Sequence, residues 1–308
     1  MTQRCGLPFT LSLLHPKNWP AWLGLGLAAI VSLFPTSVRH AIGRKIGSYI
    51  YNNNKKRRHT VNTNLKIAFP DLSESQREKM ALKHLQWYGC AIVNYSVIFF
   101  AGKKRLASMS AIQGKEHVDT AMAGNKTVML LLAHSVMLEF APPQIGYHYD
   151  IFGSYKTSKN PVLDWIVARS RCRHVSLVVA REEGLRKIVK SMSPERAMIF
   201  LPDEDLGREN SVFAPFYNKD KSTLTTTARL AKMGKAVAMP MFVYFDVNQQ
   251  KYITHIGPAL ENYPSKDAVA DATNMNQALE ALISEKPEQY MWFMKWYYTR
   301  PEGEKGVY

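Results

Sequence analysis

The second half of the chain alternates short apolar runs with segments of helical spacing, and this alternation restricts the possible folds more than any other feature. Five apolar runs have the length of strands and occupy residues 128–133, 151–154, 197–201, 237–245 and 252–256. Strands that alternate with helices predict an α/β fold, because each helix must cover a face of the sheet. We therefore expect a mixed sheet flanked by helices.

Helical segments are expected between and before these strands, several of them opening on a Ser, Thr or Asn that can cap a helix. In the second half they occupy residues 136–145, 161–171, 182–192, 223–233 and 272–284, and upstream they occupy 41–54 and 59–69. A longer helix begins at Ser73-Glu-Ser-Gln76, which matches a capping box, and runs to about Phe99. No repeat or low-complexity linker divides the chain, so we expect one domain over 41–308.

The N-terminal segment, residues 1–40, has the composition of a membrane anchor. No charged residue occurs between Asn18 and Val38, and this stretch is close to the ~20 residues that cross a bilayer. A basic segment follows it instead of a small-residue cleavage site, which disfavours a signal peptide. We expect a single anchor helix at about 18–38 that spans the membrane or dips into its interface, and the positive-inside rule places the following domain in the cytoplasm.

Net charge and missing motifs narrow the class of function. Forty Lys and Arg residues against 25 Asp and Glu residues give a formal net charge of +15, which predicts a polyanionic partner such as nucleic acid, phospholipid or a phosphorylated substrate. The three cysteines are widely separated and odd in number, which argues against a disulfide framework or a structural zinc site. No Gly-rich phosphate loop or Gly-x-Ser-x-Gly elbow is present, so kinase and serine-hydrolase chemistry are disfavoured.

The strongest candidate for chemistry is His134-x4-Glu139, directly after the apolar run 128–133. On a regular helix the two side chains would point roughly 140° apart, but a histidine in the strand-to-helix connection could fold back onto the glutamate. A neutral imidazole accepts a proton near pH 7, and a carboxylate on its other nitrogen stabilises the imidazolium. The pattern predicts activation of a hydroxyl; the alternative is a histidine at a helix start with an unrelated surface glutamate.

Two further polar clusters follow apolar runs. In the first, Asp203-x-Asp205 could bind a divalent metal and a sugar diphosphate. The two acids could instead pair with Arg171, Arg173 or Arg208, hold the hydroxyls of a substrate, or form a solvated acidic turn. In the second, residues 155–165 lead into a helix that ends in arginines, and the cations Lys156, Lys159, Arg171 and Arg173 could contact phosphates or complement the helix dipole.

The chain ends in an aromatic-rich stretch, residues 287–303, that contains Trp292, Trp296 and Tyr297. These rings carry enough apolar area to close over a lipid chain, but packing in the core is the simpler explanation for them.

Four motifs in this order resemble the bacterial lipid A late (secondary) acyltransferases. They are His134-x4-Glu139, the segment 155–165, Pro202-Asp-Glu-Asp-Leu-Gly207 with Ser211-Val-Phe-Ala-Pro-Phe216, and Pro287-Glu-Gln-Tyr-Met-Trp292. The resemblance implies a fold like that of the related glycerophosphate acyltransferases, which share a His-x4-Asp motif. It also implies transfer of a lauroyl or myristoyl chain from acyl carrier protein to the hydroxyl of a 3-hydroxyacyl chain on a lipid A precursor, at the cytoplasmic face of the bacterial inner membrane.

By this resemblance His134 matches the general base and Glu139 its orienting acid, with no cofactor, no metal and no covalent acyl-enzyme. The residues expected to bind or support the substrate are Lys156, Asn160, Arg171, Arg173, Asp203, Asp205 and Arg208. The basic charge would then serve acyl carrier protein, the phosphorylated precursor and anionic inner-membrane lipid, and not nucleic acid. The alternatives are a glycerophosphate or other glycolipid acceptor, a metal-dependent glycosyltransferase, and a catalytically silent lipid-binding protein.

Overall fold

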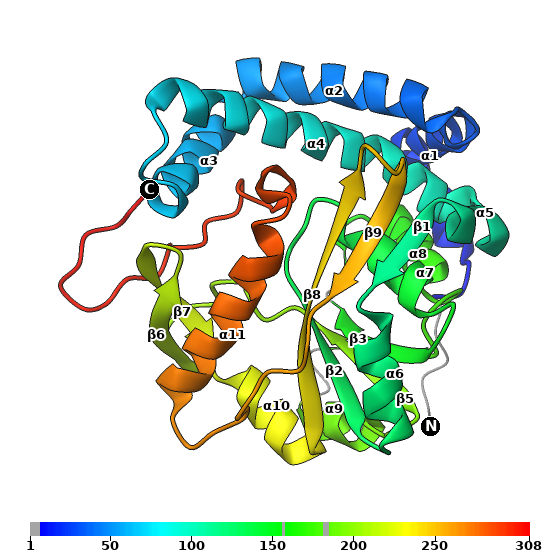
Figure 1. The fold of residues 1–308 in the computed structure, drawn as a ribbon. Helices are drawn as coiled ribbons and strands as arrows, with labels where there is room; N and C mark the ends of the chain where they lie inside the picture. Colours follow the sequence, from blue (N-terminus) through cyan, green and yellow to red (C-terminus); the bar gives the residue numbers. More distant parts are fainter. Residues whose placement is uncertain (1–6, 156–157, 181–184) are drawn as a thin grey trace.

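A seven-stranded mixed sheet with the strand order β1-β9-β8-β2-β5-β3-β4 forms the centre of the molecule (Figure 1). The computed structural model describes residues 7–155, 158–180 and 185–308. All neighbouring strands in the sheet run parallel except β8 and β9, which are antiparallel. The strands are β1 (Ser110–Gln113), β2 (Thr127–Leu132), β3 (Asp150–Tyr155), β4 (Leu177–Ala180), β5 (Arg196–Phe200), β8 (Ala236–Asp246) and β9 (Lys251–Ile256). The expected mixed sheet is confirmed.

Helices cover both faces of this sheet, and a separate hairpin, β6 (Ser211–Phe216) and β7 (Lys219–Leu224), stands beside it. The helices of the second half are α5 (Lys103–Ser108), α6 (Lys115–Ala123), η3 (Leu138–Phe140), α7 (Ala141–Ile145), α8 (Pro161–Arg171), α9 (Leu185–Ser191), α10 (Thr226–Gly234), α11 (Ala268–Ile283) and η5 (Pro287–Gln289). The first part of the chain contributes η1 (Leu11–Leu14), η2 (Pro16–Asn18), α1 (Trp19–Ser32), α2 (Thr36–Asn53), α3 (Lys55–Ala68) and α4 (Glu74–Phe100).

Two long helices, α2 and α4, lie side by side across one end of the sheet (Figure 1). Glycines allow their backbones to approach closely, since a Cβ built on Gly47 would lie 2.2 Å from the carbonyl oxygen of Leu85. A Cβ on Gly89 would lie 2.1 Å from that of Gly43. The predicted capping box opens α4, with Ser73 and Gln76 exchanging hydrogen bonds of 3.3 and 2.8 Å.

The core has two layers, one on each face of the sheet, because successive side chains of a strand point to opposite faces. In β2, Met129 and Leu131 join the layer that includes Leu230 of α10 and Leu279 of α11. The side chains between them join a second layer with α6, α7 and the middle of α4. Both faces of β2 are buried, which explains its uninterrupted apolar sequence.

Most predicted elements are present with small shifts of their ends, but several are corrected. Strands β1 and β4 and the hairpin β6–β7 were not predicted. The expected helix over 136–145 is only η3 and α7, because the chain pairs with the C-terminal segment before it turns helical. Of the expected helix 182–192, residues 182–184 lie outside the described residues, and α9 accounts for the rest.

The expected spanning anchor at 18–38 is not present. Its apolar stretch forms α1, which has 14 residues and ends before Pro35, where α2 begins. A helix of that length extends about 21 Å, against about 30 Å of bilayer hydrocarbon. Within residues 7–155, 158–180 and 185–308, no helix is both long and apolar enough to cross a membrane.

The two cysteines in the described part of the chain differ in their chemical state. Cys172 is disulfide-bonded, whereas Cys90 is free and buried between α2 and α4. Burial raises the pKa of the Cys90 thiol to about 12, so this sulfur is a packing group at neutral pH.

Candidate active site

His134 and Asp203 meet at the carboxyl ends of two neighbouring parallel strands. His134 follows the end of β2, and Asp203 follows the end of β5, its partner in the sheet. Such strand ends are where α/β sheets commonly place their sites. The Nδ1 atom of His134 lies 2.6 Å from Oδ1 of Asp203, and the backbone N–H of His134 donates to Oδ2 at 2.8 Å. One carboxylate therefore holds both the ring and the backbone of this histidine.

The carboxylate of Asp203 is fully buried and has further partners. The hydroxyl of Tyr290 donates to Oδ2 at 3.0 Å, and the ammonium of Lys221 donates to the backbone oxygen of Asp203 at 2.6 Å. Burial alone would raise the pKa of the Asp203 carboxyl, but the charge and hydrogen bonds of His134, together with the charge of Lys221, lower this pKa below its usual value. Asp203 is thus ionised at neutral pH.

The ring of His134 retains limited access to solvent, with 13% of the side chain exposed. Its centroid lies 5.8 Å from that of Trp296, which in turn stacks on Tyr290 at 4.8 Å. Because the ionised carboxylate accepts the proton on Nδ1, Nε2 is the nitrogen with a free lone pair. This arrangement can accept a proton at Nε2 and stabilise the resulting imidazolium.

Glu139, the expected orienting acid, has a different partner. It lies in η3 and pairs with Arg171 at the end of α8, where Nε of Arg171 donates to Oε2 at 3.1 Å and a terminal nitrogen donates to Oε1. The charge of Glu139 outweighs burial and raises the pKa of Arg171 above its usual value. The acid on Nδ1 of His134 is therefore Asp203, which corrects the expected contact between His134 and Glu139.

The path of the backbone explains this exchange of partners. Residues 134–137 do not start a helix but run along the C-terminal aromatic segment. The N–H of Met291 donates to the carbonyl of His134 at 2.9 Å, and the N–H of Val136 donates to the carbonyl of Gln289 at 2.9 Å. Ser135 also forms an isolated bridge with Tyr290. The C-terminal motif thus helps to position His134.

An apolar cavity of about 240 Å³ lies between the ends of β2 and β5, the first part of β3 and the end of helix α8. Glu139 and Arg171 are the two charged side chains in its wall. The remaining lining is apolar and consists of Leu132, Leu138, Pro142, Ile151, Phe152, Gly153, Val175, Val178, Ile199, Phe200 and Leu201. Leu132 is two residues before His134, so the cavity begins close to the histidine.

The other predicted site residues have structural contacts. Asn160 caps α8 by accepting from the N–H groups of Val162 and Leu163 at 3.0 and 3.1 Å. Arg173 donates to carbonyls at the end of α4, including that of Ala101 at 3.0 Å. Lys156 lies outside the described residues.

In the loop after β5, Asp205 and Arg208 bind the backbone. Asp205 accepts from the N–H groups of Gly207 at 3.1 Å and Thr299 at 2.7 Å, and Arg208 donates to the carbonyl of Arg300 at 2.8 Å. The oxygens of Asp203 and Asp205 are thus engaged by protein donors. In the part of the chain that the structure describes, no group of three or more His, Cys, Asp or Glu is arranged to hold a metal ion.

Three residues of this site were not among the predicted ones: Lys221, Tyr290 and Trp296. Tyr290 and Trp296 belong to the aromatic C-terminal stretch, where packing was the expected role. Lys221 lies in β7, whose sequence Lys-Asp-Lys-Ser-Thr-Leu has the composition of a solvated turn. The signal for Tyr290 was its place in the motif Pro287-Glu-Gln-Tyr-Met-Trp292, whereas Lys221 lies in none of the four motifs.

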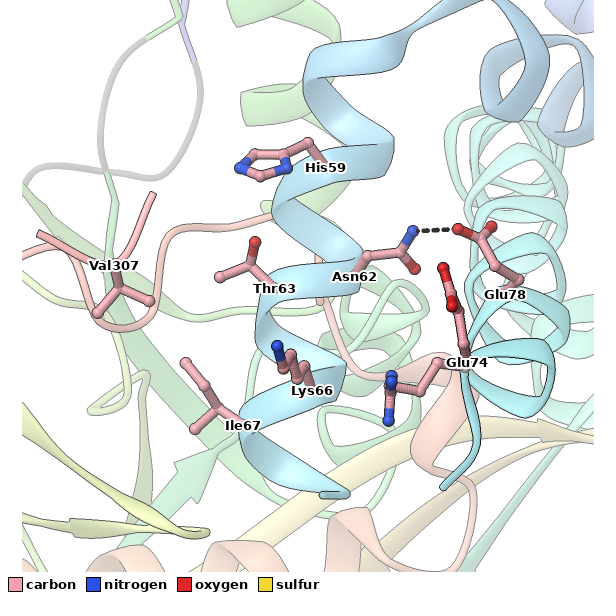
Figure 2. Close-up of a pocket in the computed structure, with 9 residues that line it drawn as sticks. His59, Asn62, Thr63, Lys66, Ile67, Glu74, Glu78 and Val307 are labelled. Atoms are coloured by element: carbon pink, nitrogen blue, oxygen red, sulfur yellow. Dashed lines mark hydrogen bonds between the residues drawn. The ribbon is translucent and has the colours of Figure 1, made fainter. Parts of the chain in front are cut away.

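A second, larger cavity of about 580 Å³ lies between α3 and the start of α4, next to Val307 (Figure 2). Its polar wall mixes both signs of charge, and Asn62 donates to Oε1 of Glu78 at 2.7 Å across it. It shares no lining residue with the cavity beside Glu139 and Arg171. The mixed lining offers no proton-accepting pair like that of His134 and Asp203.

Comparison with known proteins gives consistent matches over nearly the whole chain. A family model described as bacterial lipid A biosynthesis acyltransferase matches residues 7–299. A lipid A biosynthesis lauroyltransferase of Escherichia coli (strain K12) is 30% identical over 301 residues, 97% of this chain and 98% of that protein. A lipid A biosynthesis acyltransferase of Haemophilus influenzae is 31% identical over 309 residues, 99% of this chain and 96% of that protein.

Among solved structures, a 1-acyl-sn-glycerophosphate acyltransferase from Thermotoga maritima aligns with a TM-score of 0.36 and 13% identity. The alignment covers 80% of this chain and 95% of that one.

Proposed function

The chain belongs to the bacterial lipid A biosynthesis acyltransferase family, and from this premise we propose that it transfers a fatty acyl chain from acyl carrier protein to a lipid A precursor. The acceptor group in this proposal is the hydroxyl of a 3-hydroxyacyl chain, and the donor is a lauroyl or myristoyl thioester. The observation that carries the proposal is the His134–Asp203 pair beside an apolar cavity with a polar patch.

In the proposed reaction, Nε2 of His134 removes the proton of the acceptor hydroxyl as its oxygen attacks the thioester carbonyl. Asp203 stabilises the imidazolium that forms and keeps the ring oriented. The carbon–sulfur bond then breaks, and the leaving sulfur takes the proton from the imidazolium. The products are an ester on the acceptor and the free thiol of the carrier, so no acyl-enzyme is required.

The apolar cavity is the proposed site of the acyl chain. Its aliphatic and aromatic wall removes a hydrocarbon chain from water, which stabilises binding by about 0.8 kcal/mol per buried methylene. The contacts of Glu139 support a different role from the one expected for it: it fixes Arg171 in the wall of this cavity. Because Glu139 neutralises Arg171, the guanidinium can donate hydrogen bonds to the polar end of the acyl chain without being an uncompensated buried charge.

We further propose that α1 lies in the interface of the inner membrane, with the catalytic domain on its cytoplasmic side. Large apolar side chains of α1 and its C-terminal end are exposed, among them Trp19, Leu23, Leu27, Ile30 and Leu33. Arg44 and Lys45 of α2 are exposed nearby in the sequence and can meet anionic head groups. Liposome flotation should show binding that falls when Leu23 and Leu27 are both replaced by Ser; equal flotation of this variant would contradict the proposal.

The function is tested by incubating the enzyme in membranes with lauroyl- or myristoyl-acyl carrier protein and an under-acylated lipid A precursor, then measuring product masses. The wild type should add one or two acyl chains, and His134→Ala should add none. His148→Ala is the matched control, because His148 is exposed and outside the site. No mass gain by the wild type with either donor would contradict the proposal, and a gain only on a glycerophosphate would identify another acceptor.

A further inference from the structure

Lys221 is a fully buried lysine whose ammonium touches the carboxylate-bearing residue of the site. It lies on β7, and its Nζ donates to the backbone oxygen of Asp203 at 2.6 Å. The same Nζ lies 5.3 Å from the ring centroid of Phe216 and 5.9 Å from that of Trp296. A buried ammonium is costly unless neighbouring charges or rings compensate it. Its retention here calls for an explanation beyond packing.

The groups that face Lys221 are predominantly acidic, and they come from the loop after β5. The charges of Asp203, Glu204 and Asp205 stabilise the ammonium, although burial dominates and lowers its pKa to about 8. Other titratable groups contact the neighbours of Lys221: His134 and Tyr290 contact Asp203, Tyr297 donates to the carbonyl of Phe216, and Arg300 donates to that of Asp220. Around neutral pH the ammonium form therefore predominates.

The negative charge of a carboxylate beside an imidazole favours binding of a proton by the ring. Asp203 at 2.6 Å from the imidazole favours the imidazolium, which cannot accept a further proton. A cation on the other side of the same residue offsets that negative charge, so the resting pair of Asp203 and Lys221 is neutral overall.

We propose that Lys221 is a positioning residue that holds the backbone of Asp203 and balances its negative charge, so that Asp203 and His134 together can serve as the base. This inference rests on the proposed role of His134 as the base. Tyr290 complements it by holding the far carboxylate oxygen of Asp203. A merely structural Lys221 would join the hairpin to the loop after β5 without affecting the proton affinity of His134.

The test is an NMR titration of His134 in protein labelled with ¹³C at histidine Cε1. Comparison with His134→Ala identifies the His134 signal. Lys221→Met removes the charge and the donor, and Lys221→Gln removes the charge but keeps a donor. Both should move the titration midpoint of His134 upward by about one pH unit. The acid limb of kcat/KM should move with it. Lys219→Met is the matched control, because Lys219 lies on the same strand but pairs with Glu304.

An unchanged midpoint in either folded variant would overturn the proposal, even if activity or thermal stability falls. If neither neutral variant folds, Lys221→Arg must keep the wild-type midpoint because it keeps the cation, and a moved midpoint would overturn the proposal. Failure of the proposed function is seen separately. In that case the Lys221 substitutions move the His134 midpoint, but the wild type transfers no acyl chain.

Discussion

Two carboxylates near the carboxyl ends of the strands have contrasting surroundings. Asp203 is completely buried and accepts from a ring, a backbone N–H and a tyrosine hydroxyl. Glu139 is 20% exposed and forms an ion pair with Arg171, which is 29% exposed. Asp203 holds the ring and the backbone of His134 in one orientation, whereas Glu139 neutralises Arg171 in the wall of a cavity. This difference is consistent with the separate roles that we propose for the two acids.

Removal of the histidine is expected to have the largest effect. His134→Ala should lower kcat by roughly 10²- to 10⁴-fold, the usual contribution of a general base. Steady-state assays of acyl transfer measure this, with thermal melting as a check that the variant folds. A variant that keeps wild-type kcat would remove His134 from the mechanism and favour a lipid-binding role.

The two acids should also differ in their effect on stability. Asp203→Ala leaves the His134 N–H groups and the Tyr290 hydroxyl without their buried acceptor, and should lower the free energy of unfolding by about 3–5 kcal/mol. Glu139→Ala disrupts a partly exposed ion pair and should cost about 1 kcal/mol. Chemical denaturation of both variants makes the comparison, and equal losses would contradict the distinction drawn between them.

The shape of the apolar cavity should determine chain length. Val178 lies in the wall contributed by β4, and Val178→Phe should reduce the room for an acyl chain. We expect the ratio of kcat/KM for decanoyl- over lauroyl-acyl carrier protein to rise about tenfold, because methylenes that no longer fit lose their binding energy. Phe100→Leu, at an exposed position of α4, is a control for altered hydrophobicity. An unchanged ratio would place the acyl chain elsewhere.

Acid should remove the contribution of Asp203 selectively. Its pKa is lowered in the folded protein, so the stability it contributes is fully present above the unfolded carboxyl pKa of about 4 and is lost as the pH falls through the lower folded value. The difference in unfolding free energy between wild type and Asp203→Asn should therefore shrink as the pH is lowered below 4. A difference that does not shrink in this acid range would contradict the direction of this shift.

Much of the sheet is predictable because its central strands are buried on both faces and read as uninterrupted apolar runs. Strands β2 and β8 are examples, and their expected ends differ from the observed ones by one residue. Strands β1 and β7 escape prediction because Ser110–Gln113 is short and Lys219–Leu224 begins with three charged residues. The apolar composition of residues 18–38 was correctly recognised, but Pro35 separates it into two helices and the span is lost.

The site could be predicted in its members better than in its contacts. His134, Glu139, Arg171 and Asp203 were all candidates, but nearness in sequence favoured Glu139 as the partner of His134. Asp203 is 69 residues away from His134, and the two meet because β5 pairs with β2. Pairing of strands that are distant in sequence cannot be read from residue spacing, and neither could the burial of Lys221 behind Asp203.

The most direct test of the central claim compares Asp203→Asn with Glu139→Gln, two changes that remove one negative charge each and keep the shape of the side chain. We expect Asp203→Asn to lower kcat by about 10²-fold or more, since it removes the partner that stabilises the imidazolium. Glu139→Gln should lower kcat by about tenfold at most and act mainly on KM for the acyl donor. A larger loss of kcat in Glu139→Gln than in Asp203→Asn would contradict the account and return the orienting role to Glu139.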